Sequence, residues 1–395
     1  MSVKITGIGI ISAIGNNAEE TLHSLKTKKS GISNISILEN HEADLAGEIK
    51  YTNQELKSLL KIKDKYVSRT SLLAAFATKE ALGNIQQTKN DGFHYGIISS
   101  SSVGGMDQSE NYFKAIFQEK ASNIQLLKTH DLGDGTEFVA KYLGINGFAS
   151  TISTACSSGV NAIMLGARMI EQGMIDRVLV GGTDALSDFT INGFKSLKIY
   201  DEAWCRPMDD SRVGLNLGEA AGYLLLESDR SIEASGNKIL AEVVGYANAN
   251  DAYHQTASSP DGNGATLAIK EAIKVAAIKP EEISYINVHG TGTKNNDLSE
   301  SIALQNVFGE NIPPFSSTKA FTGHTLAAAG AIESVFSVLA LQNQVLLANI
   351  NFKKPLAETN LTPVTDYIEN AKVDYILSNS FGFGGNNSAI IFKKA

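Results

Sequence analysis

The sequence predicts a layered α/β protein whose strands are buried between helices. Five apolar, β-branched runs end abruptly in glycine-rich turns, and helical patterns separate them. Runs that are apolar on both faces are typical of strands covered on both sides. In such folds ligand chemistry gathers beyond the strand ends, where these glycines lie. The runs are VKITGIGIIS (3–12), YGIISSSSVGG (95–105), RVLVGGTD (177–184), YINVHGTGT (285–293) and YILSNSFGFGG (375–385).

The first run is interrupted by glycines and lacks the cleavage region of a signal peptide, so it predicts a first strand and turn. Helices are predicted by apolar residues at three-four spacing, first in the segment from Cys156 to Gly173. Similar patterns predict helices over 265–278 and 331–344.

A polar stretch at 227–238 divides these elements into two groups, and a new strand-like run, ILAEVVGYANA, follows it. We therefore predict an N-terminal half over 1–235 and a C-terminal half over 236–395. The 395 residues, of which 43% are hydrophobic, suffice for a core of this size. No sequence repeat relates the two halves.

The composition argues against several classes of protein. Charged residues make up 19% and the formal net charge is -8, so no general basic field attracts nucleic acid or an anionic membrane. No apolar stretch approaches the roughly 20 residues of a membrane helix. The two cysteines, Cys156 and Cys205, show neither a disulfide framework nor zinc-ligand spacing. We therefore expect no metal and a reducing, cytoplasmic setting.

Cys156 stands in TISTACSSGV (151–160), where a strand-like run stops and a helical pattern starts. A lone cysteine is usually a small buried side chain. The cap-type residues Thr154, Ser157 and Ser158 nevertheless predict that Cys156 lies at or just before the first turn of the helix. There the helix dipole and the unpaired N–H groups favour a thiolate nucleophile.

Two histidines also lie in turns rich in small residues, His289 in NVHGTGT and His324 in KAFTGHTLAAAG. Either one alone is more often a structural residue than a catalytic one. Together with Cys156 they suit thioester chemistry, which needs a soft nucleophile and hydrogen-bond donors for a developing oxyanion. Lys319 and Glu333 form either a solvated pair or a buried pair that orients the histidines, and the sequence leaves both open.

The segments TACSSG, HGTGT, KAFTGHTLAAAG and NSFGFGG, in this order, resemble the signatures of the elongating β-ketoacyl-acyl carrier protein synthases. These are condensing enzymes of the thiolase superfamily. CRPMDDSRVGLNLGEAAG (205–222) and DAYHQTASSPDGNG (251–264) resemble two further segments, so the match covers nearly the whole chain. The resemblance implies a thiolase-like five-layered αβαβα fold made of two related halves, with the site between them.

The resemblance also implies a role for each residue. Cys156 matches the acylated nucleophile, and His289 and His324 match the pair that stabilises the malonyl thioester oxyanion during decarboxylation. Lys319 matches the lysine that supports this pair, and Glu333 its ionic partner. No metal or cofactor is implied, because phosphopantetheine arrives on an acyl carrier protein.

Further matches concern binding. The backbone N–H groups of Cys156 and Phe383 would form the oxyanion hole, with the Phe383 ring as the gate of the acyl pocket. Thr291 and Thr293 match residues that hold the pantetheine arm. Val103 matches a pocket-lining position often held by isoleucine, which implies a slightly larger pocket there.

An acidic carrier requires a positive patch on its partner. The densest basic cluster lies where relatives dock their carrier, although a solvated helix face would explain it equally well. It consists of Lys61, Lys63, Lys65 and Arg69.

The pair of histidines favours an elongating enzyme, because chain-initiating relatives place asparagine at the position of His324. Degradative thiolases use a second cysteine near the C-terminus, whereas Cys205 lies mid-chain. Departures such as Leu215 for phenylalanine and Asn386 for threonine suggest a specialised polyene or pigment pathway.

The family default is a homodimer, with residues 100–160 supplying much of the interface. The chain could also be the active subunit of a ketosynthase/chain-length-factor heterodimer. If the resemblance is set aside, a cysteine acyl hydrolase remains a third hypothesis.

Overall fold

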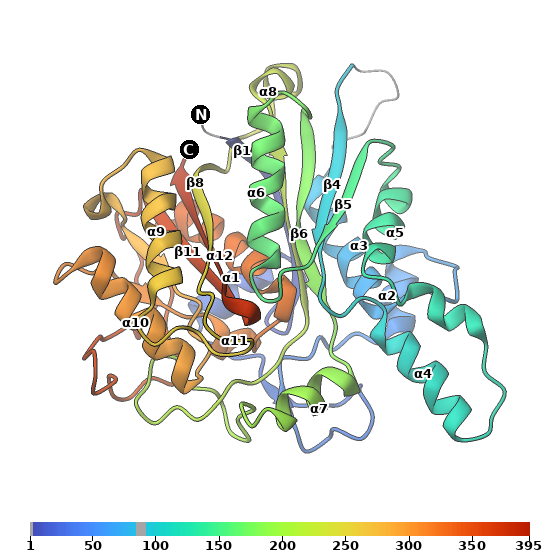
Figure 1. The fold of residues 1–395 in the computed structure, drawn as a ribbon. Helices are drawn as coiled ribbons and strands as arrows, with labels where there is room; N and C mark the ends of the chain where they lie inside the picture. Colours follow the sequence, from blue (N-terminus) through green and yellow to red (C-terminus); the bar gives the residue numbers. More distant parts are fainter. Residues whose placement is uncertain (1–2, 84–91) are drawn as a thin grey trace.

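A computed structural model describes residues 3–83 and 92–395 (Figure 1). The strands of the N-terminal half form one side of a mixed sheet, and helices connect them. In the N-terminal half the elements are β1 (Val3–Ser12), α1 (Ala18–Lys26), β2 (Ser33–Asn34), β3 (Leu45–Ala46), α2 (Asn53–Leu60), α3 (Arg69–Leu82), β4 (Tyr95–Ser100), α4 (Met106–Phe117), η1 (Ile124–Thr129), α5 (Gly133–Leu143), β5 (Phe148–Ile152), α6 (Ser158–Glu171), β6 (Arg177–Asp184), α7 (Asp188–Ser196), β7 (Ala220–Glu227) and α8 (Asp229–Ser235).

The remaining elements complete the same sheet. They are β8 (Ala241–Asn250), α9 (Asn263–Ala276), η2 (Pro280–Glu282), β9 (Tyr285–Asn287), α10 (Lys294–Phe308), β10 (Phe315–Ser316), α11 (Lys319–Thr322), η3 (Leu326–Ala328), α12 (Ala329–Asn343), β11 (Tyr375–Gly382), η4 (Phe383–Gly385) and β12 (Asn386–Lys394).

The two halves of the sheet have the same topology. Its strand order is β10-β9-β11-β12-β8-β1-β7-β6-β4-β5, with β8 and β1 paired at the centre. Outward from β1, the first two pairings are antiparallel and the next two parallel, and the same sequence of pairings holds outward from β8. The structure thus relates two halves that show no repeat in sequence.

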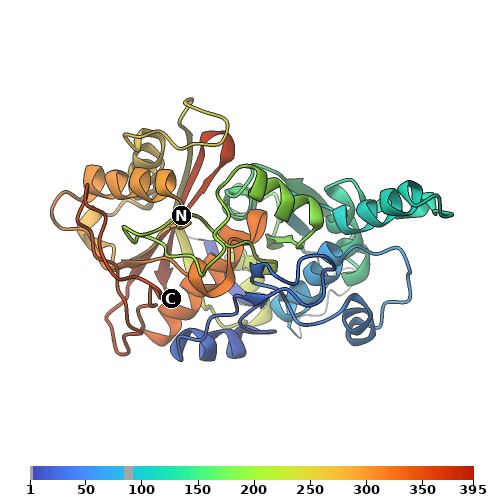
Figure 2. The same ribbon diagram turned by 90° about the horizontal axis from the view of Figure 1, so that it is seen from below.

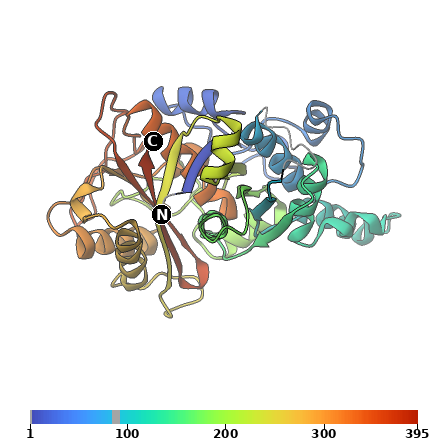
Figure 3. The same cartoon turned by 90° about the horizontal axis from the view of Figure 1, so that it is seen from above.

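Helices cover the sheet in layers and give the predicted five-layered αβαβα fold. Helices α6 and α12 pack against each other and against strands of both halves. Helix α3 packs on β1, β7 and β6 from outside, and α9 packs on β8 and β12. Figure 3 shows the two halves side by side, with the N-terminal part from blue to green and much of the C-terminal part from orange to red. Helix α4 projects from one end (Figure 2).

The predicted elements are confirmed where apolar periodicity was strong. Strands β1 and β6 coincide with their runs, and α6, α9 and α12 lie within two residues of their predicted bounds. The other three runs were predicted too long: β4, β9 and β11 end where serine- and glycine-rich loops begin, and these loops carry site residues.

Helix α12 is apolar on all sides because it occupies the central layer. Together with η3 it forms one segment, Leu326–Asn343, that is apolar and long enough to cross a membrane by length and composition. This segment is 89% buried inside the protein. Within the described ranges, no group of three or more His, Cys, Asp or Glu side chains is placed to hold a metal ion.

Candidate active site

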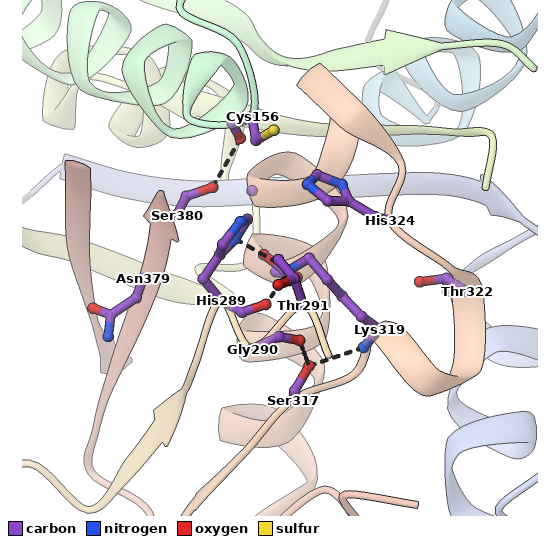
Figure 4. A network of polar contacts seen from close by, with 12 residues as sticks. Cys156, His289, Gly290, Thr291, Ser317, Lys319, Thr322, His324, Asn379 and Ser380 are labelled. Atoms are coloured by element: carbon purple, nitrogen blue, oxygen red, sulfur yellow. Dashed lines mark hydrogen bonds and ion pairs between the residues drawn. The ribbon is translucent and has the colours of Figure 1, made fainter. Parts of the chain in front are cut away.

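Cys156 lies in the turn between β5 and α6, two residues before the helix begins. Ala155 has a φ of 53°, in the left-handed region that residues other than glycine rarely adopt. The Ser158 hydroxyl fixes this turn by accepting from the Thr154 N–H at 2.7 Å. Ser380 on β11 donates to the carbonyl of Cys156 at 3.0 Å (Figure 4). The main chain at the sulfur is therefore held by both halves of the protein.

Burial raises the pKa of the Cys156 thiol to about 11. Lys319 and the backbone N–H groups of Phe383 and Cys156 act in the opposite direction. Loss of solvation thus opposes the thiolate that the start of the helix was expected to favour. A raised pKa favours the protonated thiol, whose proton has to leave during acylation.

Strand β11 ends against the nucleophile turn. A Cβ at Gly382 would lie 2.9 Å from the Cys156 nitrogen and 3.1 Å from the Thr154 carbonyl oxygen, so only glycine allows this approach. The approach brings the N–H of Phe383 to the sulfur beside the N–H of Cys156. Two convergent N–H groups at a nucleophile can donate to the oxygen of a thioester carbonyl.

His324 follows α11 and is 2% exposed. Its Nδ1 accepts from the Leu326 N–H at 3.1 Å, so the neutral ring carries its proton on Nε2. The ring of His289 lies edge-on to it, with centroids 5.3 Å apart and planes at 85°. The two rings come from separate loops of the C-terminal half and lie on the same side of Cys156 (Figure 4).

Lys319 and Glu333 form an ion pair at 2.5 Å. Both side chains are buried, so the pair is the buried one of the two forms that the sequence left open, not the solvated one. The ammonium group of Lys319 also donates to the His289 carbonyl at 2.5 Å and lies 3.2 Å from His289 Nδ1. An ammonium group has three N–H donors, and these contacts occupy all three. Because Nδ1 faces a donor, His289 also carries its proton on Nε2.

Both imidazoles are held neutral. Burial and the charge of Lys319 lower the pKa of His289 and of His324 well below the usual value. Each ring therefore offers one Nε2–H donor and carries no charge of its own. Such a pair can stabilise a developing oxyanion through hydrogen bonds.

These groups line a cavity of about 330 Å³. The rings of Phe194 and Phe383 stack in its wall, with centroids 5.8 Å apart. The cavity brings together six of the thirteen predicted site residues, with Leu215, Lys198 and Lys294 beside them. Its lining includes Cys156, His289, His324, Phe383, Thr291, Thr293, Leu215, Lys198 and Lys294.

The HGTGT loop is fixed by two acidic residues of α10 that sequence analysis missed. Glu300 accepts from the N–H groups of His289 and Gly290 at 2.9 and 2.8 Å, and burial raises its pKa to about 7. Asp297 accepts from the Thr291 N–H at 2.8 Å. The sequence does show these two acids three residues apart in the helical segment that follows the loop. The exposed face of a helix often has the same spacing, so it did not single them out.

Val103 lies one layer behind the cavity. It is 6% exposed and belongs to an apolar cluster that also contains Leu215 and Leu326. Leu215 lines the cavity directly.

The predicted basic cluster is only partly on the surface. Lys61, Lys63 and Lys65 are exposed. Arg69 was wrongly included, because it is buried and paired with Glu219 at 2.6 Å. A charged sequence pattern cannot distinguish an exposed guanidinium from one neutralised by a residue 150 positions away.

The fold and the site together define a cysteine acyltransferase of the thiolase fold, able to stabilise an enolate oxygen beside an acylated cysteine. Family models named for the N-terminal and C-terminal domains of β-ketoacyl synthase match residues 1–231 and 240–353. The chain belongs to the β-ketoacyl synthase family.

Relatives of the same family match nearly end to end. The 3-oxoacyl-[acyl-carrier-protein] synthase 2 of Staphylococcus aureus is 35% identical, over 99% of this chain and 98% of its own. The enzyme of the same name from Synechocystis sp. is 34% identical over the same shares.

Two solved structures are similar over the whole chain. The ishigamide ketosynthase/chain length factor has a TM-score of 0.92 and 29% identity, covering 100% of this chain and 99% of its own. The ketosynthase ApeO from Xenorhabdus doucetiae, in complex with its chain length factor ApeC, has a TM-score of 0.87 and 32% identity. The match covers 100% of this chain and 98% of the solved chain.

We predict that His324→Ala slows decarboxylation of a malonyl carrier thioester by roughly 10²–10³-fold, because one of two oxyanion donors is lost. His324→Asn retains a side-chain N–H and should lose less. Acylation of Cys156 should change little in both variants. Release of carbon dioxide and intact-mass analysis measure the two steps separately, and a parallel loss of acylation would contradict the assignment.

Proposed function

We propose that this protein lengthens acyl chains by a decarboxylative Claisen condensation between an acyl thioester and a malonyl carrier protein. The observation that supports this most directly is the pair of neutral Nε2–H donors, His289 and His324, beside a buried cysteine in one cavity. A hydrolase would instead need a histidine with a ring nitrogen free to take a proton from water, whereas Nδ1 of both rings already faces a donor.

The first step transfers the acyl group to Cys156. The sulfur attacks the thioester carbonyl, a new C–S bond forms and the bond to the pantetheine sulfur breaks. The thiol proton of Cys156 ends on that leaving sulfur, so no proton is gained or lost overall. The N–H groups of Cys156 and Phe383 stabilise the tetrahedral oxyanion.

The second step forms the carbon–carbon bond. The malonyl thioester loses carbon dioxide, and the electron pair of the broken bond becomes an enolate whose oxygen accepts from His289 and His324. The enolate carbon attacks the acyl-cysteine and displaces the sulfur of Cys156. With its pKa of about 11, this sulfur takes one proton from solvent and the resting thiol returns.

The acyl groups arrive on an acyl carrier protein, so the chemistry needs no resident cofactor. Thr291 and Thr293, whose hydroxyls lie 2.9 Å apart in the cavity wall, would hold the pantetheine arm. Lys198 and Lys294 line the same cavity and are exposed, which adds positive charge on the carrier's path. Lys61, Lys63 and Lys65 complete the proposed docking surface.

We propose a dimer built on the free edge of β5. This strand ends the sheet and carries an exposed phenylalanine, and further large apolar side chains face solvent at the end of α4 and in η1. Phe117 is 83% exposed, Ile124 67% and Phe148 42%. A second copy of the chain is the first candidate to cover them, in a cytoplasmic enzyme of fatty acid, polyene or polyketide biosynthesis.

The alternative partner is a chain-length-factor-like subunit. Two structural neighbours are ketosynthases with a chain length factor, which favours this second possibility. Native mass spectrometry of the purified chain distinguishes them: a stable homodimer with activity supports the first, and an inactive monomer supports the second.

The function is tested with a panel of acyl carrier proteins that differ in chain length. The purified protein is mixed with each acyl carrier and its intact mass is measured, then malonyl carrier protein is added. We expect an acyl adduct on the protein that leaves as a β-ketoacyl carrier after the malonyl chase. Release of the adduct as free acid would identify a hydrolase instead.

A further inference from the structure

Asp184 ends β6 and is completely buried, yet it pairs with no cation within the described ranges. Its partners are hydroxyl and backbone N–H groups of two loops. Complete burial of a carboxylate is costly unless several donors compensate it, so its position calls for an explanation. Neither sequence analysis nor the mechanism above assigns it a role.

The first loop held by Asp184 follows β4 and carries Val103. The carboxylate accepts from the hydroxyls of Ser101 and Ser102 at 2.7 and 2.6 Å, and from the Val103 N–H at 3.1 Å. This loop contributes Val103 to the apolar cluster that backs the cavity wall at Leu215.

The second loop is η3, which follows His324. Asp184 accepts from the Ala327 N–H at 2.8 Å, directly after the Leu326 N–H that fixes His324 Nδ1. Leu326 has a φ of 54°, so the turn adopts a conformation that needs such anchors. The Ala327 carbonyl accepts from Ser100 at the end of β4 at 3.2 Å.

Apolar contacts join the same two loops. Leu326 and Val103 are 5% and 6% exposed and belong to one cluster with Leu215. An acyl chain on Cys156 that extends past Leu215 would press on this cluster. Any displacement of the Val103 loop would then reach the His324 turn through Asp184, because close-packed interiors transmit strain.

We propose that Asp184 is a positioning residue that couples the acyl pocket to the His324 donor, so that the acyl chain on Cys156 sets the rate of malonyl decarboxylation. This inference rests on the proposed condensation and goes beyond it, because it predicts that the two half-reactions are linked. A chain of suitable length would hold His324 in place, and a poorly fitting chain would not.

The test compares Asp184→Asn with the wild-type protein. Acylation of Cys156 and decarboxylation of malonyl carrier protein are measured separately, each with a series of acyl chain lengths. We expect acylation within about twofold of wild type and decarboxylation slower by roughly tenfold or more, as for the loss of a charge-assisted hydrogen bond. The dependence of decarboxylation on acyl chain length should also flatten.

Asp176→Asn is the matched control. Asp176 precedes the other end of β6, is 8% exposed and accepts from the His94 N–H at 2.9 Å and from Arg230 at 2.7 Å. Its replacement removes a buried carboxylate next to the opposite end of the same strand, and we expect the ratio of the two half-reactions to stay at the wild-type value. Equal changes in both variants would overturn the proposal.

The double variant Ser101→Ala/Ser102→Ala provides a second test if Asp184→Asn does not fold. It removes two donors on the pocket side and leaves the Ala327 contact intact. We expect the same flattened chain-length dependence, and an unchanged dependence would overturn the coupling. Wild-type protein that forms no acyl adduct would contradict the proposed function itself and this inference with it.

Discussion

Replacing Cys156 by alanine should abolish acyl transfer and condensation, by about four orders of magnitude or more, because no other group can form the acyl-enzyme. Decarboxylation of malonyl carrier protein should persist at the rate of the unacylated wild-type protein, since both Nε2–H donors remain but no acyl chain can be loaded. Intact mass after incubation with an acyl carrier measures the first effect, and carbon dioxide release measures the second.

Cys205→Ala is the control for this experiment. Cys205 is also a buried free thiol, 1% exposed, and its pKa is likewise raised by burial. Its variant should still form the adduct at the wild-type rate. An adduct on Cys156→Ala that disappears in the double cysteine variant would transfer the nucleophile role to Cys205.

The second large effect is expected for Lys319→Met. The substitution leaves Glu333 buried without its cation, which costs about 3–5 kcal/mol of unfolding free energy. It also leaves His289 Nδ1 without its donor, so the proton is free to move from Nε2 to Nδ1. We expect decarboxylation to fall roughly 10²–10³-fold, measured beside denaturant unfolding.

The double variant Lys319→Met/Glu333→Gln separates these two consequences. A neutral amide removes the unpaired charge, so much of the lost stability should return. Decarboxylation should stay low, because the donor to His289 is still absent. Recovery of both stability and activity would show that Lys319 acts only on the fold.

The fold was largely predictable because buried strands and the central helices have strong apolar periodicity. Strand β6 and helices α6 and α12 followed directly from it. The strand order and the likeness of the two halves were not visible as a repeat, because the same topology tolerates different side chains wherever volume and polarity are kept.

The candidate catalytic groups could be singled out because Cys156, His289 and His324 each stand in a turn of small residues. The direction of the Cys156 pKa shift was not predictable, because the sequence shows where the helix starts but not how deeply the thiol is buried. Glu300 and Asp184 were missed for a similar reason. The role of a single acidic residue depends on which N–H groups donate to it, and the sequence does not show these contacts, whether they are 11 positions away as for Glu300 or 143 as for Asp184.

Because the two halves have the same topology, the loop before the central helix of one half corresponds to the loop before the central helix of the other. The two loops carry different reactive side chains. In the first half the connection between the third large strand, β5, and the central helix α6 carries Cys156. In the second half the corresponding connection, between β10 and α12, carries Lys319 and His324. If the halves descend from one duplicated ancestor, the two copies of this loop have diverged, one carrying the candidate nucleophile and the other the candidate oxyanion donor. Neither half alone therefore carries both the candidate nucleophile and the candidate oxyanion donors.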